Sequence, residues 1–170
     1  MLVEAVKQKG VGGNSLLDVG GGIGAIQHEL FKAGIARADT VEASTAYIDA
    51  NKEEAETQGH ADRITYHHGD FVDIAPNLER AYIVTLERVI CCYPDVESLV
   101  ELSSRLADRV YGLVYPRTNL LFKTVAILFN LTMRLKRSPF KVFIHPDSVI
   151  DWVARSNGLW PSSHRKTLLR

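Results

Sequence analysis

A glycine-rich turn between a strand and a helix constrains the fold of this chain more than any other segment. Residues 15–19 are mostly apolar and predict a buried strand, and the sequence GGGIG follows from Gly20 to Gly24. An amphipathic segment from about Ile23 to Lys32 then predicts a helix. Glycines allow a sharp turn and place bare peptide groups at the positive end of that helix. The turn therefore predicts a ligand-binding loop.

Short apolar runs alternate with amphipathic segments along the chain, which predicts a parallel sheet covered by helices. The expected strands cover 15–19, 39–43, 63–67, 82–86 and 110–115, and 162–169 begins a further one. The expected helices cover 2–9, 23–32, 44–58, 95–107, 119–136 and 145–157. We therefore expect an α/β, Rossmann-like, doubly wound and mostly parallel sheet of about six strands, with ligands beyond their carboxyl ends.

Acidic residues stand at three successive strand ends. Asp18 lies beside the glycine turn, Glu42 closes the second strand, and Asp70 follows the third and precedes Phe71. The expected topology brings these ends to one crevice, where Glu42 can accept hydrogen bonds from two ribose hydroxyls. Asp70 can accept from an adenine amino group while Phe71 packs on the ring. Each residue alone is also compatible with a surface carboxylate or a helix cap.

The glycine turn is compatible with two kinds of ligand. Gly20, Gly22 and Ala25 satisfy the spacing of dinucleotide-binding loops, so an NAD(P)-dependent oxidoreductase remains an alternative. A carboxylate at Asp18 would repel a pyrophosphate, whereas it suits the α-ammonium group of a bound amino acid. Asp18 therefore favours the second kind of ligand.

Together these motifs resemble the class I S-adenosylmethionine-dependent methyltransferases, and the resemblance covers nearly the whole chain. It implies one cofactor-binding domain over residues 1–170, with S-adenosylmethionine as cofactor, S-adenosylhomocysteine as product, and no metal ion. The glycines would lie against the methionine part, Glu42 would hold the ribose, and the end of the fourth strand would face the sulfonium. The implied cofactor-binding residues are Asp18, Gly20, Gly22, Gly24, Glu42, Ala43, Asp70, Phe71 and Glu87.

Two features depart from that family. Its antiparallel seventh strand is absent here, and the helix before the first strand is short. We therefore expect a fragment, and a non-catalytic cofactor-binding domain remains a second alternative to the enzyme.

The segment after the fourth strand bears on the methyl acceptor. Residues 86–94 read LERVICCYP and lack the Asn/Asp-Pro-Pro-Tyr signature of base methylation, which argues against nucleic acid as a partner. The sequence of Tyr115, Pro116 and Arg117, the following insert and His145 are similar to the magnesium-protoporphyrin O-methyltransferases. That similarity implies a carboxylate acceptor, which is already ionised at neutral pH and needs cations rather than a base. We expect O-methylation of an anionic or apolar small molecule, oriented by Arg117 and His145.

Charge is unevenly distributed although the net charge is zero. Up to Asp108 there are 18 acidic and 9 basic side chains, and from Arg109 onward 2 acidic and 11 basic. The insert at about 118–137 adds an apolar arc that is wider than packing on one side requires. It predicts a lid over the acceptor site or a helix at a membrane surface, with an ordinary packed helix and a solvated basic face as alternatives.

The only two cysteines, Cys91 and Cys92, are adjacent, which excludes a disulfide framework and a CxxC metal pair. We expect both to be buried as small apolar residues. The beginning of the chain has no signal-peptide pattern, so a cytoplasmic location is expected.

Overall fold

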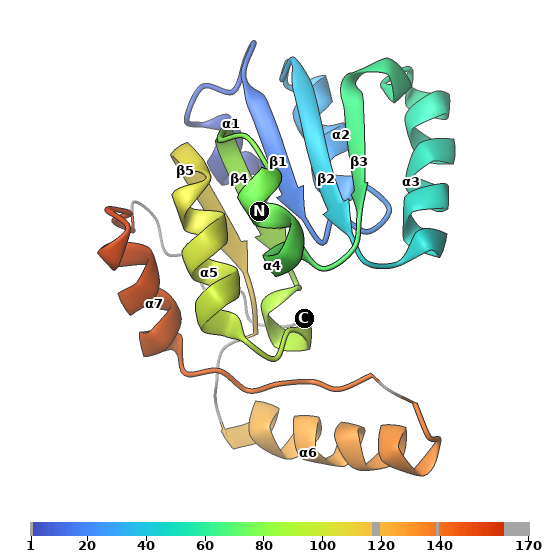
Figure 1. The fold of residues 1–170 in the computed structure, drawn as a ribbon, viewed down its shortest axis with the longest axis vertical. Coiled ribbons are helices and arrows are strands. Elements are labelled where there is room, and N and C mark those ends of the chain that lie inside the picture. The colour runs from blue at the N-terminus through green and yellow to red at the C-terminus, as the bar shows by residue number, and fades with distance from the viewer. Residues whose placement is uncertain (1, 117–119, 139, 162–170) are drawn as a thin grey trace.

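Five parallel strands form the sheet at the centre of the computed structural model, which describes residues 2–116, 120–138 and 140–161 (Figure 1). The strands are β1 (Ser15–Val19), β2 (Arg37–Glu42), β3 (Ile64–His68), β4 (Ala81–Glu87) and β5 (Ala107–Val114). Their order in the sheet is β3-β2-β1-β4-β5, and every neighbouring pair is parallel. The order reverses direction between β1 and β4, and this switch point is where open α/β sheets bind ligands.

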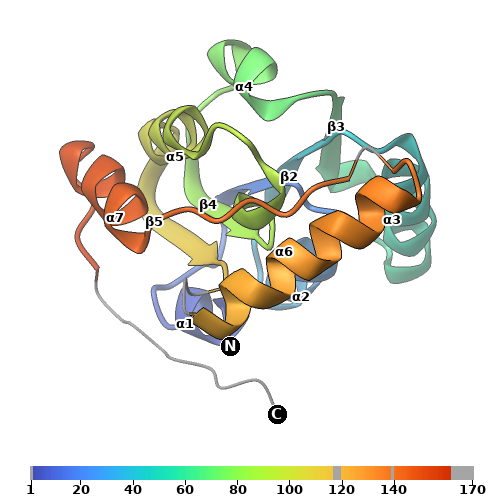
Figure 2. The same ribbon diagram turned by 90° about the horizontal axis from the view of Figure 1, so that it is seen from below.

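Helices cover both faces of the sheet (Figures 1 and 2). One face carries α1 (Leu2–Lys7), α2 (Ala25–Lys32) and α3 (Thr45–Gln58), and the other carries α4 (Phe71–Ile74), α5 (Val96–Arg105) and α7 (Asp147–Ser156). Within the described residues, the short 3-10 helices η1 (Ala61–Arg63), η2 (Ala75–Asn77) and η3 (Ile90–Cys92) lie in connections. The expected doubly wound α/β fold is confirmed.

Alternation along the inner strands builds one apolar core on each face. Leu17 and Val19 of β1 pack with α5 and α7 side chains, including Leu99 and Ile150. Leu16 points the other way, into a second cluster that contains residues of α1 and α2. Asp18 shares the face of Leu16 because side chains alternate along a strand. The Asp18 carboxylate therefore lies on the α2 side of the sheet, near the carboxyl end of the central strand.

Local sequence signals set several boundaries as expected. The first strand is found at Ser15–Val19, and α3 begins after Ser44, whose hydroxyl accepts a hydrogen bond from the Tyr47 amide at 3.4 Å. α3 ends at Gly59, which adopts the left-handed conformation with φ 71°.

Two elements differ most clearly from the expectation. β5 begins at Ala107 rather than Val110, because an edge strand tolerates polar residues and Arg80 pairs with Asp108 at 2.8 Å. The four-residue helix α4 was not expected, since it is too short to show a helical period. The sixth expected strand, 162–169, lies outside the described residues.

The expected helical insert is present as α6 (Leu120–Leu135), which crosses below the carboxyl ends of the strands (Figure 2). The chain returns along residues 140–145, and the Asn130 side chain joins the two segments. It donates to the Val142 carbonyl and accepts from the Val142 amide, both at 2.8 Å. No helix in the described part of the chain is long and apolar enough to cross a membrane.

Candidate functional site

The carboxylate of Asp18 is the most unusual group at the carboxyl edge of the sheet. It is 1% exposed and lies in register with Thr40 of β2 and Thr85 of β4. The Thr85 hydroxyl donates to its Oδ1 atom at 2.7 Å, whereas its Oδ2 atom is buried without a hydrogen-bond partner. An unpaired buried carboxylate oxygen is costly, so a hydrogen-bond donor or a cation that reached Oδ2 would be bound favourably.

Burial raises the pKa of Asp18 to about 7, and the Thr85 hydrogen bond only partly opposes this increase. The negative charges of Glu87 and Glu42 raise the pKa further. A cation beside Oδ2 would reverse these effects, because it stabilises the ionised form. The electrostatics of this edge therefore favour a positively charged ligand.

The glycine turn leaves bare backbone around Asp18. A Cβ atom at Gly21 would lie 3.0 Å from Asp18 Oδ2, whereas one at Gly22 would meet nothing within 4 Å. Gly20 allows close packing of Val89, because a Cβ there, at φ 66°, would lie 2.1 Å from a Val89 methyl group. The turn is closed on the Val89 side and open at Gly22.

Gly24 has a packing role. It is buried with φ 83°, and a Cβ there would lie 2.5 Å from the Gln27 amide nitrogen and 2.7 Å from Asn51 Oδ1. Gln27 of α2 donates to Asn51 of α3 at this point. The absence of a side chain at Gly24 thus allows α2 and α3 to approach each other.

Glu42 links the end of β2 to the glycine turn. Its Oε2 accepts from the Gly22 amide at 3.1 Å, and its Oε1 accepts from the Ser44 amide at 2.9 Å. Each oxygen keeps a second lone pair, so the carboxylate can still accept from a ligand. Ala43, the next residue, is exposed at the same edge, and its carbonyl accepts from the His68 ring at 3.1 Å.

Asp70 is exposed at the end of β3 and caps α4, accepting from the Val72 amide at 2.9 Å. The same Oδ1 atom accepts from the Tyr93 hydroxyl at 2.5 Å. Phe71 is 4% exposed and packs in the core. The expected packing of its ring on an adenine does not fit this position, because the α5 side of the core already surrounds the ring.

The end of β4 carries Glu87 and a strained residue. Glu87 is half-buried, with Arg88 Nε 3.8 Å from its Oε1. Arg88 has φ 61°, and its amide donates to the Val114 carbonyl at 2.8 Å. Left-handed backbone at a residue other than glycine is costly and concentrates at functional sites.

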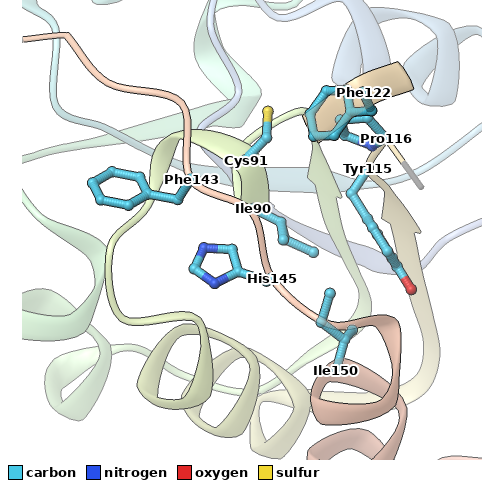
Figure 3. Close-up of a pocket in the computed structure, with 8 residues that line it drawn as sticks. All are labelled: Ile90, Cys91, Tyr115, Pro116, Phe122, Phe143, His145 and Ile150. Atoms are coloured by element: carbon cyan, nitrogen blue, oxygen red, sulfur yellow. The ribbon is translucent and has the colours of Figure 1, made fainter. Parts of the chain in front are cut away.

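A shallow pocket lies beside η3, between the end of β5 and residues 143–150 (Figure 3). It is small, about 10 Å³, which is room for a single water molecule, and its lining includes Phe122, Phe143 and Ile150, together with His145 and Cys91. The His145 ring donates its Nε2 proton to the Tyr93 carbonyl at 2.8 Å. The structure thus places His145 at a pocket, whereas Arg117 lies outside the described residues.

The expectation that both cysteines are buried is wrong. Cys91 is half-buried and Cys92 is exposed, because η3 lies at the surface edge of the sheet. Their sulfur atoms are 3.7 Å apart. The described residues contain no cluster of three or more His, Cys, Asp or Glu side chains that could hold a metal ion.

Sequence reasoning missed the contacts through which three residues shape the site. Val89 closes the glycine turn, Tyr93 bonds Asp70, and the Asn51 side chain donates to the Gly22 carbonyl at 3.2 Å. Each meets its partner through long-range packing. No local pattern marks these contacts; the only available signal was the position of Val89 directly after a strand.

Comparisons with known proteins agree with this geometry. The family described as "Methyltransferase domain" matches residues 17–109, which is more than half of the chain. This match confirms the resemblance to the class I methyltransferases. A search of curated protein sequences gives no match.

Several solved structures share the fold. An O-methyltransferase family protein from Burkholderia thailandensis superposes with a TM-score of 0.73 at 18% identity, covering 94% of this chain and 50% of that one. Magnesium protoporphyrin IX methyltransferase from Synechocystis PCC 6803 with bound S-adenosylmethionine has a TM-score of 0.73 at 18% identity, covering 99% and 72%. The YcgJ protein from Bacillus subtilis has a TM-score of 0.70 at 18% identity, covering 92% and 67%. The chain thus spans half the length of the Burkholderia protein.

Burial of the Asp18 carboxylate predicts how the free energy of unfolding depends on pH. Because the folded pKa of Asp18 is about 7, above its ordinary value of 3.8, its ionisation opposes folding as pH rises between these values. Asp18→Asn should therefore stabilise the protein, by roughly 2–3 kcal/mol more at about pH 8 than at about pH 5. Urea unfolding at both pH values measures this difference, with Asp49→Asn on the exposed face of α3 as control. An equal effect of Asp18→Asn at both pH values would contradict the burial argument.

Proposed function

This chain belongs to the methyltransferase domain family, and we propose that it transfers a methyl group from S-adenosylmethionine to a small-molecule acceptor. The observation that carries the proposal is the row of carboxylates at the ends of β1, β2, β3 and β4, with one buried oxygen of Asp18 unpaired. S-adenosylmethionine carries an ammonium and a sulfonium group, so it is a cation that such an edge attracts.

The residues present fit this cofactor. Asp18 Oδ2 would pair with the α-ammonium group, which approaches over the bare backbone of Gly21 and Gly22. Glu42 would accept from the ribose hydroxyls at the adjacent strand end while it holds the Gly22 amide. Asp70 would accept from the adenine amino group. We assign no ring stacking to Phe71, since its ring lies in the core.

When bound, the cofactor supplies an electrophilic methyl group on a positively charged sulfur. The chain orients this group and provides negative potential, because Glu87 closes β4 next to Asp18 and Glu42. Methyl transfer converts the sulfonium to a neutral thioether, so these carboxylates attract the substrate form more than the product form. The same charges that hold the cofactor thus favour product release.

For the acceptor we propose an anionic, largely apolar molecule that is methylated on a carboxylate oxygen. Such a nucleophile is ionised at neutral pH, so in-line positioning is the main requirement. The small pocket beside η3 follows the end of β4 in the chain, Phe122 of α6 lines it, and it would have to open at α6 to admit the acceptor. We propose that α6 covers the bound acceptor and that Arg117 and His145 orient its carboxylate. Contact of α6 with a membrane is a separate proposal, since it requires no acceptor.

The two alternative functions give different results in the same binding experiment. A dinucleotide-dependent oxidoreductase would bind NAD in preference to S-adenosylhomocysteine, although Asp18 opposes a pyrophosphate at the glycine turn. A non-catalytic domain would bind S-adenosylhomocysteine and yet methylate no acceptor.

Glu42 should dominate ribose recognition, because two hydroxyls bonded to one carboxylate make charge-assisted hydrogen bonds. Glu42→Ala should weaken S-adenosylhomocysteine binding more than tenfold, about 1.5–3 kcal/mol, in a calorimetric titration. Asp70→Ala should weaken it less, and Glu53→Ala on the exposed face of α3 should leave it unchanged. Unchanged affinity of Glu42→Ala, or tighter binding of NAD by the wild-type chain, would contradict the assignment.

The acceptor proposal predicts a separation of catalysis from cofactor binding. Arg117→Ala should lower kcat/KM for magnesium protoporphyrin IX, the acceptor named for the Synechocystis enzyme, tenfold to hundredfold. The affinity for S-adenosylhomocysteine should stay nearly unchanged. Arg37→Ala, at the amino end of β2, is the matched control and should retain full turnover. Equal turnover by both variants would exclude Arg117 from acceptor binding.

A further inference from the structure

Helix α6 has one face that packs on the protein. Ala126 is 2% exposed, and Asn130 bonds both backbone groups of Val142. Phe129 packs edge-on against Phe140, with ring centroids 6.0 Å apart. At about 100° per residue, Ala126, Phe129 and Asn130 lie on the same side of the helix. Packing of α6 on residues 140–145 is therefore satisfied by this side alone.

The opposite side of α6 is apolar and exposed. Its large side chains, with their exposed fractions, are Ile127 (63%), Leu128 (58%), Leu131 (53%) and Leu135 (77%). Scattered exposed apolar residues are normal, but Leu131 is a neighbour of the other three, which lie three or four residues from it along the helix. A contiguous exposed apolar surface of this kind marks an interaction site. We call these four side chains the outer face of α6.

Basic residues border the outer face. Lys123 and Arg134 follow one edge of it, and Lys136 lies in the turn directly after the helix, with all three exposed. Between Arg109 and Pro146 the sequence has seven Lys and Arg residues and no Asp or Glu. An apolar strip bordered by cations is the pattern of a helix that lies in a membrane interface.

We propose that the outer face of α6 docks on an anionic lipid bilayer, with the helix lying in the plane of the headgroups. The apolar side chains would enter the acyl boundary, while Lys123, Arg134 and Lys136 remain among the anionic headgroups. A second copy of this chain is a poorer partner, because it would bring the same cations against these cations. The proposal does not depend on the reaction.

Flotation with lipid vesicles tests the proposal on the whole chain. Wild-type protein should bind vesicles of phosphatidylcholine with about 30% phosphatidylglycerol at least tenfold more tightly than pure phosphatidylcholine vesicles. Salt at about 0.5 M should remove most of that difference, because it screens surface charge. Absence of binding to the anionic vesicles would overturn the proposal.

Substitutions on α6 distinguish docking through its outer face from nonspecific binding of the protein to vesicles. Leu131→Glu should weaken vesicle binding at least tenfold, whereas Tyr47→Glu, which adds the same charge at an equally exposed residue of α3, should not. Replacing Lys123, Arg134 and Lys136 by Gln should weaken binding on the order of 100-fold, since each cation near an anionic surface contributes about fivefold. S-adenosylhomocysteine affinity and circular dichroism should stay at wild-type values and show that the variants are folded.

Two outcomes would identify a different occupant and overturn the proposal. Equal losses of vesicle binding for Leu131→Glu and Tyr47→Glu would show that added negative charge weakens vesicle binding wherever it is placed. Vesicle binding would then not depend on α6. If the wild-type chain sediments as a dimer and Leu131→Glu as a monomer, while neither binds vesicles, the outer face joins two copies of the chain.

Discussion

The buried carboxylate of Asp18 is the constraint on which the rest of the site depends. It is at the end of the central strand, between Thr40 and Thr85, and only one of its oxygens has a hydrogen-bond partner. Ionising it without a partner costs folding free energy, which the apolar clusters on both faces of the sheet offset. On our proposal the protein retains this group because it pairs with the ligand, and the bare glycine turn around it gives that ligand access.

The neighbouring carboxylates extend this constraint along the edge. Glu42 holds the glycine turn through the Gly22 amide, and Glu87 adds negative charge next to Asp18. Like charges at adjacent strand ends destabilise the free protein, and a cationic ligand relieves their repulsion. The carboxylates that destabilise the free protein are therefore the same groups that would bind a cationic ligand. α6 and the pocket beside η3 lie at the same edge, where an acceptor would meet the ligand.

The doubly wound fold class and the glycine turn after the first strand could be derived from the sequence, because hydrophobic periodicity and turn residues are local signals, whereas the strand order came only from the structure. Asp18, Glu42 and Asp70 could be assigned to one edge for the same reason. The surroundings of Phe71 could not, since only the packing of α4 and α5 against the sheet shows that its ring is in the core. The contacts of Tyr93 with Asp70 and of Val89 with Gly20 were also missed, because they join the segment after β4 to loops far away in the sequence. Gly24 could be recognised as part of the loop, but its contact with Gln27 and Asn51 appears only when two helices are packed.

The central claim is that the unpaired oxygen of Asp18 receives the ammonium group of the cofactor. Calorimetric titration with S-adenosylhomocysteine, in buffers of different ionisation enthalpy, measures the protons released on binding. Because the pKa of Asp18 is about 7 in the free protein, the group is mostly protonated at about pH 6. A cation beside it lowers that pKa, so binding should release close to one proton at about pH 6 and much less at about pH 8.5. No release by the wild-type chain at about pH 6, or the same release by Asp18→Asn, would contradict the claim.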